Sequence, residues 1–214
     1  MRPVFFLLFF LFFFSKGYSQ EFPTEIWHEG MLVLESQDTL RGNIKYDIKG
    51  DIVQINIGNT IQTYSSRKIL FFEIFDRTAN RYRYFYSLPY YVNENYKTSI
   101  LFEVLYEGEL SLLCREELIQ ETVPAYTYAY RSSGYYSRYR MVYEYFFLGE
   151  SGTIERYSEK KKDLLYRLRK YQYEIKQYIK SNRLRYDSKS DLIKIVEYYN
   201  ELLSGQFKEN TFEE

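Results

Sequence analysis

Short runs in which apolar and polar residues alternate one by one fill the chain from residue 30 to about residue 157. The clearest run is residues 39–46, where one side carries Leu40, Gly42, Ile44 and Tyr46. A period of two predicts a β-strand with one face in water. Comparable runs occupy residues 31–34, 53–57, 60–64, 69–75, 81–86, 100–106 and 109–114.

Tight turns separate these runs. Gly58-Asn59 is a two-residue turn signal between two of them, and Glu107-Gly108 is another. Short strands at regular spacing, joined by tight turns, predict an antiparallel β meander that is barrel- or sandwich-like. No helical pattern interrupts the runs, which argues against a parallel sheet built from strand–helix–strand units.

The hydrophobic period changes from two to three or four near Ser158. The first stretch with this period predicts one amphipathic helix or two short ones in line, and it carries Leu164, Leu165, Leu168, Tyr171, Ile175, Tyr178 and Ile179. A further helix is predicted after Ser188, whose hydroxyl can cap it, with Asp191 at the capping-box position and Gly205 as its stop. The predicted fold class is therefore α+β, mostly β, with two or three C-terminal amphipathic helices packed on the sheet.

The first residues carry a different pattern. The eleven residues from Val4 to Phe14 are all Phe, Leu or Val, behind the single charge of Arg2 and before Ser15-Lys16. This pattern is typical of a cleavable secretory signal peptide, and it is shorter than the roughly 20 apolar residues that span a bilayer. We predict cleavage before Gln20, with retention as an N-terminal anchor as the alternative. The predicted divisions are a signal peptide (1–19), an antiparallel β domain (20–157), a helical segment (158–205) and a frayed tail (206–214).

Composition narrows the function classes without choosing among them. The 29 basic and 29 acidic residues balance, so charge gives no general argument for nucleic acid or for an anionic membrane as partner. Cys114 is the only cysteine, which excludes an internal disulfide, and its place on an alternating apolar face predicts a buried hydrophobic role. The unusual count is 26 tyrosines, because tyrosine suits half-buried sheet surfaces.

No catalytic, metal-binding or nucleotide-binding motif stands out. His28 is the only histidine, for which we predict a packing or surface role, and no zinc spacing, nucleophile elbow or phosphate loop occurs. We therefore predict no catalytic residue, no metal and no cofactor. Paired carboxylates are the remaining enzymatic option, because a glycan hydrolase needs only two acids across a cleft. Spacing selects no pair among the candidate acids, which are Glu73, Asp76, Glu103, Glu107 and Glu109.

The most distinctive segment runs from Tyr126 to Tyr145 and is rich in tyrosine and arginine. The turn signal Ser132-Ser133-Gly134 within it predicts a hairpin, with a row of phenol rings on one face and guanidinium groups nearby. Such a face suits stacking on a sugar ring, a peptide or another protein, with arginine over the rings adding cation–π attraction. The alternative is that the rings only cover the sheet or the helices. The candidate partner-binding residues are Tyr126, Tyr128, Tyr130, Tyr135, Tyr136, Arg138, Tyr139 and Arg140.

Several short motifs recur along most of the chain. They are Gly30 and Val33 followed by Asp-Thr-Leu-Arg-Gly-Asn-Ile-Lys-Tyr at 38–46, the run Phe-Glu-Val-Leu-Tyr-Glu-Gly-Glu-Leu-Ser-Leu at 102–112, and Tyr199-Asn200 in the closing helix. Together with the Phe-rich leader that ends in Ser-Gln, they resemble a large group of uncharacterised exported proteins of Bacteroidota. The resemblance implies a periplasmic or surface location and a β domain with a helical end. It implies no activity and no catalytic residue.

The leading hypothesis is a non-enzymatic binding or structural module of the cell envelope, located in the periplasm or at the outer-membrane surface, whose partner is an envelope protein or a glycan. A carboxylate-based glycan hydrolase is the first alternative and an outer-membrane β-barrel is the second. Nucleic acid is not expected as a partner. Peripheral contact of the basic helix face at residues 159–170 with anionic lipid stays open, as does the oligomeric state.

Overall fold

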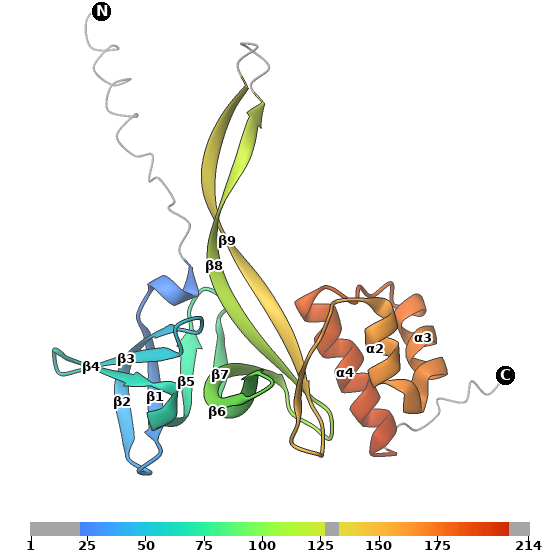
Figure 1. The fold of residues 1–214 in the computed structure, drawn as a ribbon, viewed down its shortest axis with the longest axis horizontal. Coiled ribbons are helices and arrows are strands. Elements are labelled where there is room, and N and C mark those ends of the chain that lie inside the picture. Colours follow the sequence, from blue (N-terminus) through green and yellow to red (C-terminus); the bar gives the residue numbers. More distant parts are fainter. Residues whose placement is uncertain (1–21, 127–132, 206–214) are drawn as a thin grey trace, which may run out of the picture.

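The computed structural model describes residues 22–126 and 133–205, and it combines one antiparallel sheet with helices near the C-terminus (Figure 1). The predicted class, α+β and mostly β, is confirmed. The strands are β1 (His28–Leu34), β2 (Thr39–Asp47), β3 (Ile52–Ile57), β4 (Thr60–Ser65), β5 (Ile69–Asp76), β6 (Arg81–Asn93), β7 (Tyr96–Tyr106), β8 (Ser111–Tyr126), β9 (Ser133–Leu148) and β10 (Ile154–Arg156). Their order across the sheet is β10-β9-β8-β7-β6-β5-β1-β2-β3-β4.

The strand order departs from a simple meander at one place. Strands β1 to β4 follow each other across the sheet, but β5 returns through the short 3₁₀-helix η3 (Ser66–Lys68) and pairs with the other edge of β1. From β5 to β10 each strand again lies beside the next one in sequence. The described strands therefore form one sheet with β10 and β4 at its two ends, rather than two stacked sheets.

Local sequence explains the individual strands and turns. In β2 the apolar side of the alternation is the buried one, with Ile44 and Tyr46 almost fully enclosed and Arg41 and Asn43 exposed. The predicted turn at Gly58-Asn59 joins β3 to β4, and both residues have positive φ, 53° and 69°, as a tight two-residue hairpin turn requires.

Two glycines allow the first strands to approach each other closely. Gly30 and Gly42 are cross-strand neighbours. A Cβ on Gly30 would lie 2.2 Å from the carbonyl oxygen of Glu73, and a Cβ on Gly42 would lie 2.4 Å from that of Asn56. Only glycine fits at such distances. The strands here pack around a first core that includes Leu32, Ile44, Tyr46, Val53, Ile55, Phe72, Ile74, Phe85 and Leu101.

The helical segment consists of α2 (Lys161–Arg167), the 3₁₀-helix η4 (Arg169–Tyr171), α3 (Gln172–Ser181) and α4 (Lys189–Leu203). The described part of the chain thus has three α-helices, within the predicted range. Ser188 is the N-cap residue of α4 as predicted, but its hydroxyl lies 3.2 Å from that of Ser190 and does not cap the helix. Leu192, Ile195, Val196 and Tyr199 of α4 form a second core with residues of β8 and β9. None of the helices within the described ranges is long and apolar enough to cross a membrane.

One face of the sheet, which we call the core face, points toward both cores. A single row of cross-strand pairs crosses it and consists of Leu40, Leu32, Phe72, Phe85, Glu103, Cys114 and Tyr145. Cys114 is fully buried in this row, as its alternation predicted. Glu103 is the one charged member, and it marks the place where the first core ends and the second begins.

Several strands are longer than the alternation predicted. β6 continues past Tyr86 through Pro89 to Asn93, because Leu88 and Tyr90 pack on a third cluster around Phe102 and Phe146. β8 and β9 have 16 residues each, and their far ends project from the body of the protein (Figure 1).

A candidate partner-binding arm

The projecting part of the β8–β9 hairpin is a two-stranded ribbon. The two strands pair continuously from Ser111 with Leu148 to Tyr126 with Ser133. Their neighbours stop much earlier, because β7 pairs with β8 only as far as Cys114 and β10 pairs with β9 only as far as Phe146. We call residues 117–126 and 133–142 the arm; it rises from the body between the β1–β5 part of the sheet and the helices (Figure 1).

One face of the arm continues the core face of the sheet and carries no charge. Strand alternation and pairing place four cross-strand pairs on it, which are Leu118 with Met141, Gln120 with Tyr139, Thr122 with Ser137 and Pro124 with Tyr135. The exposed fractions of Tyr135 and Tyr139 are 77% and 52%. This uncharged face therefore presents phenol rings to solvent rather than burying them in the sheet.

The opposite face of the arm is held together by ion pairs. Glu121 accepts a hydrogen bond from Nε of Arg138 at 2.6 Å and another from Nε of Arg140 at 3.2 Å. These hydrogen bonds, that from Arg138 first, lower the pKa of the Glu121 carboxyl. Tyr136 shares this ion-paired face and is 50% exposed.

The structure separates the candidate residues into these two faces. Tyr135 and Tyr139 lie on the uncharged face, whereas Tyr136, Arg138 and Arg140 lie on the ion-paired face. The guanidinium groups of Arg138 and Arg140 contact Glu121, so strand alternation places them away from the row of rings that they were expected to cover. Tyr126 ends β8 opposite Ser133. Tyr128 and Tyr130 lie outside the described residues, as does the predicted signal peptide.

A buried ion cluster fixes the root of the arm. At its centre is Arg83, which is 3% exposed and whose guanidinium lies 2.8 Å from Glu116, 2.9 Å from Glu103 and 3.1 Å from Asp76. Glu116 is the last residue of β8 before the arm, and it also accepts a hydrogen bond of 2.7 Å from the Tyr46 hydroxyl. Side chains from β5, β7 and the arm root therefore bind the guanidinium of Arg83, which belongs to β6.

The helices reach the same cluster through Lys189. Its ammonium group lies 2.8 Å from Glu103, and it also stands over the ring of Tyr143 with 5.0 Å to the ring centroid. Arg81 binds the other oxygen of Glu103 at 3.2 Å. Three basic side chains, Arg81, Arg83 and Lys189, thus face the three carboxylates, so the charges balance and the buried cluster can be tolerated.

The ionisation of the cluster follows from these contacts. Burial alone would raise the pKa of the Glu103 carboxyl, but the charges of Arg83 and Lys189 outweigh burial and lower that pKa. Burial also acts to raise the pKa of Asp76, yet hydrogen bonds from Thr78 and the charge of Arg83 lower it. Burial and the negative charge of Glu116 raise the pKa of Tyr46 well above its usual value. Glu103 and Asp76 are therefore held as charged carboxylates and Tyr46 as a neutral phenol.

The beginning of the described chain packs against the arm. Phe22, only 6% exposed, contacts Tyr139 edge to face with 6.5 Å between the ring centroids. The 3₁₀-helix η2 (Pro23–Glu25) follows, and the ring nitrogens of His28 lie 2.7 Å from the carbonyl oxygen of Pro23 and 3.3 Å from that of Phe75. The buried His28 thus has a packing role, as one of its predicted alternatives, and it ties this segment to β5.

The structure brings only two of the acids considered for hydrolysis together, Asp76 and Glu103, and both bind Arg83. Asp76 and Glu103 belong to the ion cluster, where both pKa values are lowered, opposite to what a general acid needs. Glu107 and Glu109 are exposed near the turn before β8. Glu73 shares a groove of about 630 Å³ with Glu29, Arg41, Asn43 and Tyr82 on the outer face of the sheet.

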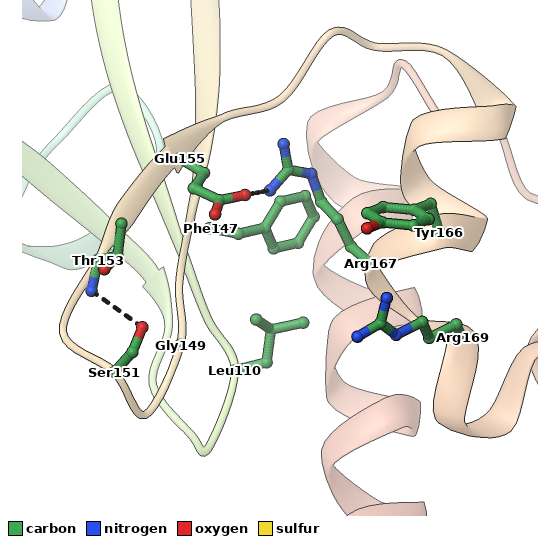
Figure 2. Close-up of a pocket in the computed structure, with 9 residues that line it drawn as sticks. All are labelled: Leu110, Phe147, Gly149, Ser151, Thr153, Glu155, Tyr166, Arg167 and Arg169. Atoms are coloured by element: carbon green, nitrogen blue, oxygen red, sulfur yellow. Dashed lines mark hydrogen bonds and ion pairs between the residues drawn. The ribbon is translucent and has the colours of Figure 1, made fainter. Parts of the chain in front are cut away.

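A smaller cleft of about 290 Å³ lies between the β9–β10 turn and the first helical residues (Figure 2). Arg167 borders the cleft and forms ion pairs with Glu155 and with Asp163, and its Nε lies 3.0 Å from the Asp163 carboxylate. Arg169 points toward the cleft and stands over the ring of Tyr166 with 5.2 Å to the centroid (Figure 2). The cleft is small, and the side chains that line it largely contact each other, so the arm is the stronger candidate site. No family model, no curated protein and no solved structure matches the chain.

Proposed function

We propose that this chain is an exported, non-enzymatic binding module of the cell envelope and that the uncharged face of its arm contacts a protein partner. The observation that carries the proposal is the exposure of Tyr135 and Tyr139 on a rigidly rooted ribbon. Exposed aromatic rings on a projecting strand are typical of an interaction site, and among the described residues only Phe22 packs on this row of rings, at Tyr139.

A protein suits this surface better than a glycan does. The ribbon projects as an exposed, twisted pair of strands (Figure 1). Protein partners typically bury about 800 Å² on each side, whereas small ligands prefer concave sites. Tyrosine is enriched at the centres of protein interfaces, where its ring is buried and its hydroxyl finds a partner. Because the face carries no charge, the complementary surface is one of aromatic, aliphatic and hydroxyl groups without unpaired charge.

The export part of the proposal rests on residues 1–19. Their one-charge start, apolar run and small residues before Gln20 support a cleaved leader. N-terminal sequencing of the protein recovered from the periplasm or the outer membrane tests this point, with Gln20 as the expected first residue. Recovery of the uncleaved chain in the inner membrane would contradict cleavage.

The binding part is tested by comparing the two faces of the arm. The double variant Tyr135→Ser with Tyr139→Ser changes the uncharged face, and Tyr136→Ser is a matched control on the ion-paired face. In pull-downs from native envelope extract, we expect the double variant to lose captured protein at least tenfold and the control to retain it. Melting temperatures should change by only a few degrees, because Tyr135 is largely exposed and Tyr139 loses a single edge-to-face contact with Phe22, worth about 0.5–1.5 kcal/mol.

Equal capture by the double variant and the control would sink the proposal, whether both retain the partner or both lose it. Capture that depends on the uncharged face but is competed by an envelope polysaccharide would instead assign a glycan as the partner.

A further inference from the structure

Along the arm, one backbone edge of β9 pairs with no other strand of the described residues. The pairing with β10 ends where Arg156 faces Phe146, and the N–H of Tyr157 then donates to the carbonyl oxygen of Tyr145 at 2.8 Å. Between there and Ser133, β8 is the only described strand that pairs with β9. One whole side of the β9 arm is therefore open.

The bond from Tyr157 also identifies which residues face the open edge. In an antiparallel strand the N–H and C=O of one residue point to the same side, and the side alternates from residue to residue. Because the carbonyl of Tyr145 points toward β10, the odd-numbered residues direct their backbone groups to the open edge. They are Tyr135, Ser137, Tyr139, Met141 and Tyr143.

The two edges of the arm are not equivalent. By the same alternation, Pro124 of β8 faces the opposite edge, where it offers no N–H, and Lys49 forms an ion pair with Glu117 near the root of β8. The β9 edge from Tyr135 to Tyr143 contains no proline and no lysine, two of the residues that protect edges against strand addition. Its two charges, Arg138 and Arg140, are already paired with Glu121 of β8. An isolated two-stranded ribbon is only marginally stable in water, and added strands stabilise it.

We propose that a second copy of this chain pairs with the open β9 edge, antiparallel and about a twofold axis at Ser137, which joins two arms into one four-stranded sheet. The occupant follows from the self-complementarity of the β9 sequence. The inference goes beyond the proposed function, because it does not depend on which other protein the arm binds.

Charge, shape and the length of the pairing select the register. Axes at Tyr135 or Tyr136 would pair only residues 133–137 or 133–139 of the described strand, a shorter pairing than an axis at Ser137 gives. Axes at residues 138 or 140 would place Arg138 or Arg140 opposite its own copy, and an axis at Tyr139 would place Arg138 opposite Arg140. An axis at Met141 avoids these contacts, but it would run residues 133–137 into positions 145–149 of the other copy, which β10 already occupies in part.

An axis at Ser137 avoids both conflicts. Residues 133–141 of the two copies then pair, with Tyr135 opposite Tyr139 on the uncharged face. On the ion-paired face, Tyr136 lies opposite Arg138, which favours a cation–π contact. The uncharged faces of the two arms become one continuous surface, so dimerisation enlarges the face proposed above for partner binding.

Cysteine cross-linking tests the register. In Ser137→Cys the two sulfur-bearing residues face each other across the axis at a Cα separation of about 5.5 Å, within the roughly 4.4–6.8 Å range of disulfides. In the matched variant Met141→Cys, the two cysteines lie eight residues apart along the paired strands, or about 27 Å. Upon mild oxidation of purified protein, Ser137→Cys should yield a covalent dimer and Met141→Cys should not. The native Cys114 is buried, so the unmodified protein gives the background.

A proline substitution tests the edge itself. Ser137→Pro removes an N–H that faces the open edge and no hydrogen bond between β8 and β9, whereas Ser137→Ala keeps the N–H. Sedimentation equilibrium should show a dimer for the wild type and Ser137→Ala, and a dissociation constant at least tenfold higher for Ser137→Pro with a similar melting temperature.

A wild-type protein that stays monomeric, or a Ser137→Pro variant that dimerises as tightly as Ser137→Ala, would overturn the inference. Cross-linking through Met141→Cys in place of Ser137→Cys would overturn the register. If the protein is a monomer that still captures a partner through Tyr135 and Tyr139, the dimer is contradicted and the proposed function stands. If it is a dimer that captures no partner through these residues, the proposed function is contradicted and the dimer stands.

Discussion

The hydroxyl of Tyr46 donates a hydrogen bond of 2.7 Å to Glu116 across 70 positions of sequence. This bond joins the first core, to which Tyr46 belongs, with the strand that becomes the arm. The same hydroxyl accepts a hydrogen bond of 2.7 Å from Arg83. The direction in which the arm leaves the sheet is therefore set by a buried polar network rather than by apolar packing alone.

Removing the central charge of this network should destabilise the whole sheet. Arg83→Met keeps much of the side-chain volume but leaves Glu103, Glu116 and Asp76 without their shared partner. Breaking a buried ion pair from one side costs about 3–5 kcal/mol, and Tyr46→Phe, which removes only one hydroxyl, should cost about 1–3 kcal/mol. Urea unfolding measures both. The exposed substitution Lys49→Ala is the control, and a loss from it as large as that from Arg83→Met would contradict the central role of the cluster.

Acid should weaken the fold through the same carboxylates. The pKa of Glu103 and that of Asp76 are lowered in the folded protein, so the unfolded chain takes up their protons first as the pH falls. The stability they contribute is complete above the unfolded values of about 4 and is lost as the pH drops from there through the folded values. Urea unfolding between neutral pH and pH values below about 3 should show this decline. In Glu103→Gln the decline should be smaller, and an equally steep decline would assign it to other groups.

Close approach of the strands at Gly42 should make this position intolerant of any side chain. The Cβ of Gly42→Ala would meet the backbone carbonyl of Asn56, which cannot move without disturbing β3. Overpacking of this kind costs about 1–3 kcal/mol. Gly149→Ala is a matched control, because nothing lies within 4 Å of its added Cβ. Chemical denaturation of the two variants should separate them clearly, and equal stabilities would mean that the strands do not approach so closely.

The thiol of Cys114 should be inert in the folded protein. Burial raises its pKa and excludes reagents from it. In the folded protein the thiol reacts only in molecules that have opened. Its rate of reaction with a maleimide should therefore be lower than in urea by roughly a factor of 10³ or more. Mass spectrometry of timed samples gives this rate, and rapid labelling without denaturant would show that the second core opens locally.

Sequence reasoning recovered the elements whose signals are local. Alternation in 39–46, the turn at Gly58-Asn59 and the helical period after Ser158 depend on neighbouring residues, and all three match the structure. The return of β5 to the far edge of β1 is a long-range choice, made by packing of Phe72 and Ile74 in the first core, and no local signal carries it.

The sequence carries a signal for the ion cluster, in the form of charged residues at core-facing positions. Arg83 occupies the same alternating side as Phe85, and Glu103 the same side as Leu101, so each is a charge at a core-facing position of its strand. A charge at such a position indicates a buried partner. Its identity could not be predicted, because Arg83, Glu103 and Glu116 meet only after three separate strands have paired.

The sequence predicts the arm as a hairpin, but the prediction placed the phenol rings and the guanidinium groups close together. Tyr139 and Arg138 differ by one position, so they must lie on opposite faces of a strand, and this separates Arg138 from the row of rings that carries Tyr135 and Tyr139. The projection itself depends on where β7 and β10 stop, which no residue of the arm encodes.

The length of the arm determines how far its tip lies from the body of the protein. Each of its strands contributes ten residues, from Glu117 to Tyr126 and from Ser133 to Val142, and at about 3.4 Å per residue they span about 30 Å. A partner bound at the far end of the uncharged face would therefore lie about 30 Å from the ion cluster at the arm root. If the arm binds a partner as proposed, its length sets the distance between that partner and the body of the protein.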